Sequence, residues 1–246
     1  MTDRRVALVN EAGGYVGPDL ARQLARRGHD LVVGNASSEL VAELEGLGAQ
    51  VVNVDGVRNL AHEGAAATLV AAALDTYGRL DAAAAFTGMI IPGKFLDSSR
   101  EDLSKLVEGC LVAPYEFLKA VVPPMVAAGG GQICLMTSAT AARPTKGAAL
   151  YSSVRAGATM MAQNLAAEIA ATGVQVNVLG TNFMDFPEFH AAAGTDDPEV
   201  RKFFEAQIPM KRMGQLDEFA SFAMAFLDGT SGFTTGQFVG YAGGWA

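Results

Sequence analysis

Short apolar segments and longer helical segments alternate along almost the whole chain, and this alternation constrains the fold more than any other feature. The first apolar segment, Val6–Val9, runs into a glycine-rich turn that contains Gly13, Gly14 and Gly17. Leucines and alanines with helical spacing then cover residues 19–27. A strand, a glycine-rich turn and a helix in this order are typical of the first unit of a doubly wound sheet.

The same order of elements continues through the rest of the chain. Further strands, each almost continuously apolar, are predicted at residues 30–33, 50–54, 80–86, 131–136, 174–179 and 237–239. Helices are predicted from Ser37 onward and at residues 65–77, 100–127, 149–171 and 216–227, with a looser stretch at 181–208. The predicted fold is α/β, a single Rossmann-like doubly wound parallel sheet with helices on both faces, in one domain over residues 1–246.

Composition and charge exclude several classes of protein. Half of the 246 residues are hydrophobic and 18% are charged, which excludes a disordered chain. The net charge is −8 and the arginines adjoin only at residues 4–5 and 26–27, so we expect no nucleic-acid partner. The uncharged apolar stretch at residues 82–93 is too short to span a bilayer, and we expect no membrane association.

The cysteines and histidines give no sign of a metal site. Cys110 and Cys134 both lie in apolar segments, which predicts two core thiols and a reducing, cytoplasmic environment. The three histidines lie far apart in the sequence, so the chain is not expected to hold a metal ion.

Candidate functional residues follow the predicted strands, because ligands of open α/β sheets bind outside the carboxyl ends of the strands. The long helix at residues 149–171 begins with Tyr151 and carries Arg155 four positions later, on the same face. A cation beside a phenol lowers the phenol pKa and favours its use as a base. Ser138, which follows a predicted strand, could hold a substrate oxygen. The alternative is that Tyr151 and Arg155 form an ordinary surface pair.

The spacing of Ser138, Tyr151 and Arg155 on this fold resembles the short-chain dehydrogenase/reductase superfamily, and the resemblance covers essentially the whole chain. The usual superfamily pattern is YxxxK. Arg155 in place of the lysine resembles one branch, the halohydrin dehalogenases, which use the fold without a nicotinamide cofactor.

The glycine-rich turn also departs from the reductases of that superfamily, which begin with TGxxxGxG. Here the corresponding positions hold Asn10, Glu11, Tyr15 and Gly17, so a ring and a carboxylate lie where a diphosphate would pass. The dehalogenase branch shows T-x4-[FY]-x-G, which this chain matches at Tyr15 and Gly17. The resemblance therefore implies that no cofactor binds.

Other positions that handle a dinucleotide in the superfamily are altered as well. Residues 34–35 are Gly-Asn without an acidic residue, residues 85–88 replace the NNAG motif, and Cys110 replaces an asparagine. Asp55 remains at a position where many members contact adenine. The loop at residues 180–183 resembles the dehalogenase sequence G-P-N-aromatic, with Thr181 in place of the proline.

The resemblance implies dehalogenation of vicinal haloalcohols to epoxides, with ring opening of epoxides by small anions as the reverse reaction. Ser138 would bind the substrate hydroxyl, Tyr151 would remove its proton, and Arg155 would hold the tyrosine pKa down. The alkoxide would then displace the halide. The halide or nucleophile would lie against Tyr15, Thr181, Asn182, Phe183 and Met184, and the substrate pocket would include Phe86, Thr140 and Phe186.

Two other functions stay open at this point. One is an NAD(P)-dependent short-chain dehydrogenase/reductase with divergent cofactor motifs, and the other is a non-catalytic member that binds a partner or a small molecule. The helices at residues 100–127 and 149–171 are expected to pair across a two-fold axis in a homotetramer, with Tyr241 and Trp245 at a subunit interface.

Overall fold

The computed structural model describes residues 4–245. Their strands form one seven-stranded sheet in the order β3-β2-β1-β4-β5-β6-β7, and every neighbouring pair is parallel. The strands are β1 (Val6–Val9), β2 (Asp30–Gly34), β3 (Val51–Val54), β4 (Ala82–Phe86), β5 (Gly131–Ser138), β6 (Val174–Thr181) and β7 (Phe238–Tyr241). The order of strands reverses between β1 and β4, as in a doubly wound sheet. The predicted fold is confirmed.

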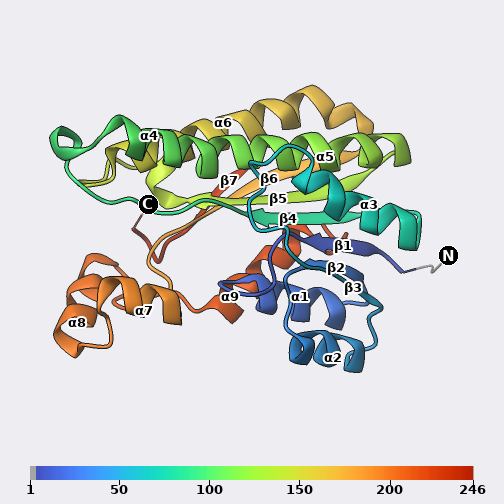
Figure 1. Cartoon of the computed structure of the whole chain (residues 1–246), viewed down its shortest axis with the longest axis horizontal. Helices are drawn as coiled ribbons and strands as arrows, with labels where there is room; N and C mark the ends of the chain where they lie inside the picture. The colour runs from blue at the N-terminus through green and yellow to red at the C-terminus, as the bar shows by residue number, and fades with distance from the viewer. Residues whose placement is uncertain (1–3, 246) are drawn as a thin grey trace.

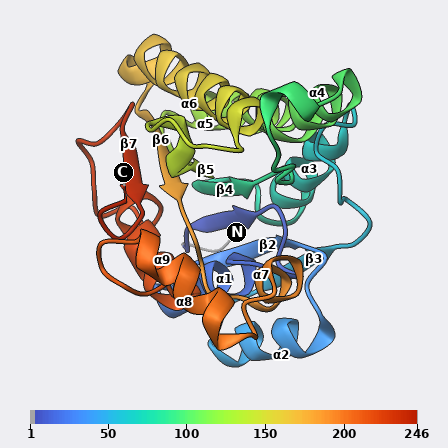
Figure 2. The same ribbon diagram turned by 90° about the vertical axis from the view of Figure 1, so that its left-hand side faces the viewer.

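Helices cover both faces of this sheet (Figures 1 and 2). One face carries α1 (Gly17–Arg26), α2 (Ser38–Gly46) and α9 (Leu216–Ala223), and the other carries α3 (Ala65–Tyr77), α5 (Ala113–Ala128) and α6 (Ala149–Ile169). Alternate residues of each strand point to opposite faces, so Val9 joins the first core and Leu8 joins the second. Two apolar cores thus enclose the sheet and fix its carboxyl edge.

The predicted helix at residues 100–127 is not one regular helix. It consists of α4 (Arg100–Val107), a π-helical turn η2 (Glu108–Val112) and α5. Pro114 lies in the first turn of α5, directly after the π-helical turn. A missing N–H in a first helical turn costs little. Pro123 and Pro124 lie inside α5, which continues to Ala128 and ends against the left-handed Gly129.

The run Arg100–Ala128 is long and apolar enough, by length and composition, to cross a membrane. Its α5 part packs Phe117, Val121 and Met125 into the core on one face of the sheet. The core helices of water-exposed domains pass the same length and composition test, and this packing is that of a core helix.

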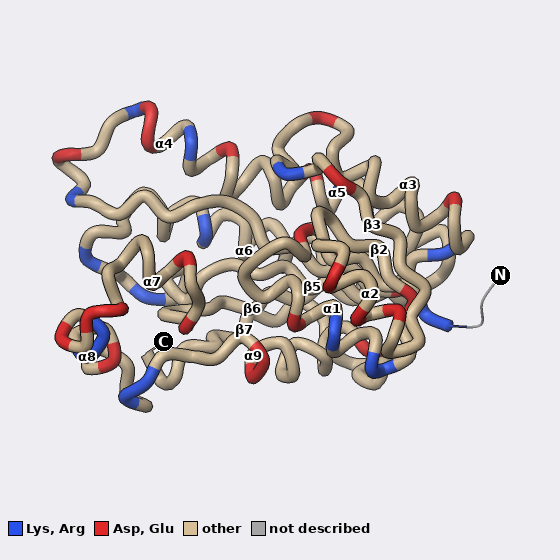
Figure 3. The backbone as a smooth tube through the Cα atoms, turned by 60° about the horizontal axis from the view of Figure 1, so that its bottom comes forward, with Lys and Arg blue, Asp and Glu red and all other residues tan. Residues whose placement is uncertain are grey.

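The stretch at residues 181–208, for which no helix is predicted, contains α7 (Pro187–Ala193) and α8 (Pro198–Gln207). These two helices project from the carboxyl edge of the sheet (Figure 1). Three phenylalanine rings join them to the end of β6: the Phe204 centroid lies 5.0 Å from that of Phe183 and 5.4 Å from that of Phe189. Acidic and basic residues lie side by side on α8 rather than forming a purely basic patch (Figure 3).

The chain ends beside the carboxyl edge. Trp245 is buried against Ala139 and Ala242, and the Arg143 guanidinium lies 4.7 Å above its ring. The ring of Tyr241 packs 5.1 Å from that of Phe219. Both rings therefore pack within their own chain, and the predicted subunit interface at Tyr241 and Trp245 stays untested.

Short connecting segments complete the described chain. They are the turns of 3-10 helix η1 (Phe95–Asp97), η3 (Ala139–Ala141), η4 (Ala170–Thr172) and η5 (Met224–Phe226). The turn η3 matters for the site, because it follows β5 directly and its first hydrogen bond runs to Ser138.

Candidate active site

Tyr151 and Arg155 lie one turn apart near the start of α6, and both side chains are buried. The guanidinium carbon of Arg155 is 5.1 Å from the centre of the Tyr151 ring. The alternative of a surface pair is therefore excluded. The helix presents this pair at the carboxyl edge of the sheet, where a ligand is expected.

Arg155 has hydrogen-bond donors to spare. Its Nη2 donates to the backbone oxygen of Thr87 at 2.6 Å, whereas Nε and Nη1 are buried without a hydrogen-bond partner. No ion pair within residues 4–245 includes Arg155, although only 6% of its surface is exposed. Burying a guanidinium without an acidic partner is costly, and such groups are typical of functional sites.

Ser138 ends β5 and lies opposite Thr181 in the register with β6. Its Oγ accepts hydrogen bonds from the backbone N and the Oγ1 of Thr140, at 3.2 and 3.1 Å, and donates to the backbone oxygen of Thr181 at 3.5 Å. Within the described chain no hydrogen bond joins Ser138 to Tyr151. Thr140, predicted as a pocket residue, thus fixes the rotamer of Ser138, and the long bond to Thr181 is one that the hydroxyl can readily exchange.

Tyr15, from the turn after β1, contacts Thr181, the residue that also accepts the hydrogen bond of Ser138. Its hydroxyl donates to Thr181 Oγ1 at 3.1 Å, and its ring centroid lies 5.4 Å from that of Phe86 and 4.9 Å from that of Phe186. Burial raises the pKa of Tyr15 to about 12, with smaller contributions from the Thr181 hydrogen bond and from the charges of Tyr151 and Arg155. The structure therefore brings Tyr15, Thr181, Tyr151 and Arg155 together, with Ser138 joined through Thr181.

The other residues predicted in the loop after β6 are distributed differently. Met184 is 2% exposed and packs in the core against Gly214, so its side chain does not line a ligand site. Phe183 belongs to the aromatic cluster with Phe189 and Phe204. Asn182 has a buried Nδ2 without a hydrogen-bond partner. Only Asn182 therefore offers a free polar group from this loop.

Asp185, which the sequence analysis does not single out, forms hydrogen bonds that join α7, α8 and the segment before α9 beside the site. Its carboxylate accepts from Arg201 Nη2 on α8 at 2.5 Å, from Gln215 Nε2 before α9 at 3.1 Å, and lies 2.5 Å from His190 Nε2 on α7. These hydrogen bonds, that of Arg201 above all, lower the pKa of Asp185 to about 2. The partners lie 5 to 30 residues away, so no local sequence pattern announces them.

Cys110 lies in the π-helical turn beside the site. Its Sγ is 3.6 Å from the backbone oxygen of Met89, and burial raises the pKa of its thiol. A Cβ on Gly88 would lie 2.4 Å from that Sγ, so the turn after β4 depends on this glycine. Both cysteines are buried and free, as predicted. No group of His, Cys, Asp and Glu in residues 4–245 is placed to hold a metal ion.

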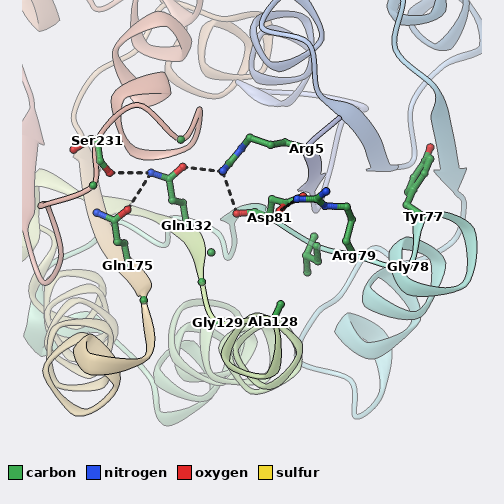
Figure 4. A pocket seen from close by; sticks show the side chains of 16 residues that line it. Arg5, Tyr77, Gly78, Arg79, Asp81, Ala128, Gly129, Gln132, Gln175 and Ser231 are labelled. Carbon is green, nitrogen blue, oxygen red and sulfur yellow. Dashed lines mark hydrogen bonds and ion pairs between the residues drawn. The ribbon is translucent and has the colours of Figure 1, made fainter. Parts of the chain in front are cut away.

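A cavity lies at the opposite, amino edge of the sheet (Figure 4). It has a volume of about 530 Å³. Its polar side chains bond to one another: Arg5 Nη2 donates to Gln132 Oε1 at 3.0 Å, and Gln132 Nε2 donates to Gln175 Oε1 at 3.1 Å. Because its polar groups have partners and none of the candidate residues lines it, this cavity is not the candidate active site.

The glycine-rich turn does not fit the diphosphate of a dinucleotide in this conformation. Glu11 Oε1 accepts the backbone N–H of Gly13 at 2.7 Å, and Glu11 Oε2 accepts from Asn35 Nδ2 at 2.9 Å. The Glu11 carboxylate therefore occupies a backbone donor near the amino terminus of α1, where such folds bind a phosphate. Pro18 in the first turn of α1 removes one further N–H donor, and the ring of Tyr15 adds bulk beside it.

Comparison with known proteins assigns the class of the chain. Residues 14–246 match a protein family described as "Enoyl-(Acyl carrier protein) reductase". The chain belongs to this family, and thereby to the oxidoreductases of the short-chain dehydrogenase/reductase superfamily.

Individual relatives agree over nearly the whole length. The chain is 28% identical over 248 residues to 2,5-dichloro-2,5-cyclohexadiene-1,4-diol dehydrogenase LinX of Sphingobium indicum, which covers 98% of this chain and 96% of that protein. It is 31% identical over 243 residues to oxidoreductase UcpA of Salmonella typhimurium, which covers 94% and 90%.

Solved structures confirm the fold. A structure described as YwfH, an NADPH-dependent reductase involved in bacilysin biosynthesis, has a TM-score of 0.87 at 22% identity and covers 99% of both chains. A gluconate 5-dehydrogenase from Burkholderia cenocepacia in complex with NADP and tartrate has a TM-score of 0.87 at 22% identity and covers 99% of this chain and 96% of its own.

These comparisons correct the predicted function. The prediction of a cofactor-independent halohydrin dehalogenase is wrong, because the family and the relatives named above are reductases, dehydrogenases and oxidoreductases. The halide or nucleophile site at Tyr15, Thr181, Asn182, Phe183 and Met184 was predicted from that function and stays an untested prediction. Arg155 and Tyr15 are two local departures from the superfamily pattern, and they do not outweigh similarity along the whole chain.

Proposed function

We propose that the chain is a nicotinamide-dependent oxidoreductase that interconverts a hydroxyl and a carbonyl group on a small molecule. The observation that carries this proposal is the buried Tyr151–Arg155 pair, which lies with the Ser138–Thr181 pair at the carboxyl edge of the sheet. Similarity to a diol dehydrogenase over 98% of the chain supports the same class of substrate group.

Ser138 and Tyr151 have the chemistry to handle the substrate oxygen. The hydroxyl hydrogen of Ser138, held only by a 3.5 Å bond to Thr181, can turn to the oxygen of a bound carbonyl. Tyr151 then delivers its phenolic proton to that oxygen as negative charge develops on it, and the reverse reaction removes the proton from an alcohol. Thr140 keeps Ser138 in place throughout.

Arg155 acts on this proton transfer through its charge. A guanidinium acts as a fixed cation and does not serve as a proton donor or acceptor in catalysis. Placed 5.1 Å from the centre of the Tyr151 ring, it stabilises the negative charge that the phenolic oxygen carries after the transfer. The bond from Nη2 to Thr87 fixes the guanidinium in that place.

In this proposal a bound nicotinamide dinucleotide would supply the hydride that reduces the carbonyl carbon, or accept it from the alcohol. Descriptions of solved structures of the same fold include NADPH or NADP. The spare donors of Arg155 and the polar group of Asn35, Asn53 and Asp55 beside the ends of β2 and β3 suit a ligand rich in hydroxyls. The glycine-rich turn does not suit its diphosphate as it stands.

The proposal is tested by turnover of a panel of small secondary alcohols and ketones with each of the four nicotinamide cofactor forms. We expect oxidation or reduction of the cofactor that falls by about 10²- to 10⁴-fold in Tyr151→Phe. Tyr77→Phe, the same change at the opposite edge of the sheet, serves as the control and keeps the parent rate. Turnover that survives Tyr151→Phe undiminished, or no turnover with any member of a broad panel, would overturn the proposal.

We also propose that the chain acts as a homo-oligomer, a tetramer, in the cytoplasm. A groove between α5 and α6 is lined by Tyr115, Leu118, Val122 and Met161 among others, and Met160 beside it is 55% exposed. Leu103 on the neighbouring α4 is 38% exposed. Apolar patches of this kind on helices are typical of protein–protein interfaces, and a second copy of the chain would cover them by two-fold symmetry.

A further inference from the structure

Two side chains of the glycine-rich turn occupy the region outside the strand ends where the ligand of a doubly wound sheet lies. Glu11 is the first, since its carboxylate binds the Gly13 N–H at 2.7 Å and the Asn35 amide at 2.9 Å. The Asn35 side chain in turn accepts the N–H of Gly56 and donates to the backbone of Val57. The carboxylate is thus embedded in a network that joins the ends of β1, β2 and β3.

Tyr15 is the second side chain. Its ring packs against Phe86 at the end of β4 and against Phe186 after β6, while its hydroxyl reaches Thr181. The side chain therefore crosses the edge of the sheet from β1 to β6, over the point where the strand order reverses. In open α/β sheets that crevice is where the ligand lies.

This closed arrangement is stabilised and strained at the same time. The hydrogen bond and the two ring contacts stabilise it. Against them, Tyr15 has a φ of 47°, a left-handed conformation that bulky side chains rarely adopt. The closed state also leaves Arg155 Nε and Nη1 and Asn182 Nδ2 buried without acceptors. Such an arrangement can be exchanged for one in which a polar ligand satisfies the same donors.

We propose that Tyr15 and Glu11 form a gate that closes the dinucleotide groove against its own ligand. A dinucleotide binds only when the Tyr15 ring leaves the space between Phe86 and Phe186 and when Glu11 releases the N–H of Gly13. This inference rests on the proposed function for the identity of the ligand, a dinucleotide with a negatively charged diphosphate and ribose hydroxyls.

The gate has a quantitative consequence for affinity. When a protein binds a ligand only in a minor conformation, the apparent dissociation constant rises by the reciprocal of that population. One hydrogen bond and two ring contacts together correspond to a factor of about 10 to 100 in this equilibrium. The parent chain is therefore a weak binder of nicotinamide dinucleotides, and loss of either gate residue strengthens binding by a factor of this order.

The experiment is equilibrium binding of NADH and NADPH, followed by cofactor fluorescence and by calorimetry, with no substrate present. The variants are Tyr15→Ala, which removes the ring, and Glu11→Ala, which frees the Gly13 N–H and removes the charge. Tyr15→Phe keeps the ring and loses only the Thr181 bond, so it should fall between the parent and Tyr15→Ala. Phe222→Ala, which removes a ring from the partly buried aromatic contacts of α9, controls for a general loss of packing.

We expect tighter binding in Tyr15→Ala and Glu11→Ala, by about 10-fold or more, and no gain in Phe222→Ala. Equal or weaker binding in both gate variants, or parent binding as tight as theirs, would overturn the gate. If Tyr15→Ala does not fold, Glu11→Ala and Tyr15→Phe carry the same test. If the gate variants bind the dinucleotide more tightly but no cofactor turnover is seen, the gate is upheld and the proposed reaction fails. If turnover is seen but the gate variants bind the dinucleotide no more tightly than the parent, the proposed reaction is upheld and the gate fails.

Discussion

The guanidinium carbon of Arg155 lies 5.1 Å from the centre of the Tyr151 ring, and neither side chain has an acidic partner among the described residues. A tyrosine with a fixed, buried cation against its ring is poorly suited to a purely structural role, because the buried charge is uncompensated. The same pair is well suited to stabilise a phenolate that forms and disappears during proton transfer.

Because the Arg155 charge is buried without an acidic partner, we expect its removal to lower turnover without lowering the melting temperature. In Arg155→Met a side chain of similar length without charge replaces the buried guanidinium, so the melting temperature should stay the same or rise. Turnover should fall by at least about 10-fold, because nothing then stabilises the phenolate. Thermal unfolding and steady-state turnover of the same preparation check both parts. A melting temperature several degrees lower with unchanged turnover would mean that Arg155 only supports the fold.

The lowered pKa of Asp185 predicts that the free energy of unfolding decreases at low pH. Its folded pKa of about 2 lies below the ordinary value of 3.8, so its bonds stabilise the fold above pH 4 and this stabilisation disappears as the pH falls towards 2. The shift corresponds to up to about 2 kcal/mol in the free energy of unfolding.

Urea unfolding of the parent and of Asp185→Asn tests this dependence. The two free energies should differ by up to about 2 kcal/mol at pH 6 and converge by about pH 2. Asp97→Asn, at an exposed position before α4, should match the parent at both pH values. A difference between the parent and Asp185→Asn that persists unchanged at pH 2 would show that the carboxylate charge is not its cause.

Trp245, the single tryptophan, reports on the end of the chain. Removal of the guanidinium above its ring in Arg143→Ala should move its fluorescence to longer wavelength, because the indole becomes more exposed to water. Stability should fall by no more than about 1 kcal/mol, the usual range for such a contact. Arg58→Ala, at an exposed loop position, should leave the spectrum unchanged. An unchanged spectrum in Arg143→Ala would contradict the packing described for Trp245.

The apolar surface of α4, α5 and α6 predicts the oligomeric state. A charge in the middle of this surface, as in Met160→Glu, should lower the molar mass measured by light scattering from that of a tetramer to that of a dimer or monomer. Leu74→Glu, a similar change on α3 outside this surface, should leave the mass unchanged. A parent that is monomeric at micromolar concentration would contradict the proposed assembly.

Most of the fold could be predicted from the sequence because its strands are continuous apolar segments between helices of regular period. The strand Val6–Val9 and the helix Ala65–Tyr77 have the predicted bounds, and β5 and β6 extend two residues beyond theirs. The helices α7 and α8 were missed, because aromatic contacts between distant residues such as Phe183 and Phe204 stabilise them, rather than a periodic pattern.

The candidate site was only partly predictable. The spacing of Tyr151 and Arg155 predicts that the two side chains lie on one helix face. It does not predict that both are buried, or that Nε and Nη1 of Arg155 have no hydrogen-bond acceptor. The contacts of Asp185 depend on chain segments up to 30 residues apart, which no spacing rule reveals. Function was the weakest prediction. Tyr15 and Arg155 resemble the dehalogenase pattern, whereas similarity along the whole chain assigns it to the oxidoreductases of the short-chain dehydrogenase/reductase superfamily.

The most direct test of this account is cofactor turnover by the purified parent chain with small secondary alcohols and ketones, compared with Tyr151→Phe. We expect substrate-dependent oxidation or reduction of a nicotinamide cofactor in the parent and a loss of about 10²- to 10⁴-fold in the variant, with an unchanged melting temperature. An equal rate in the two proteins, or no substrate-dependent change of the cofactor across the panel, would contradict the assignment of Tyr151 as the group that transfers the proton.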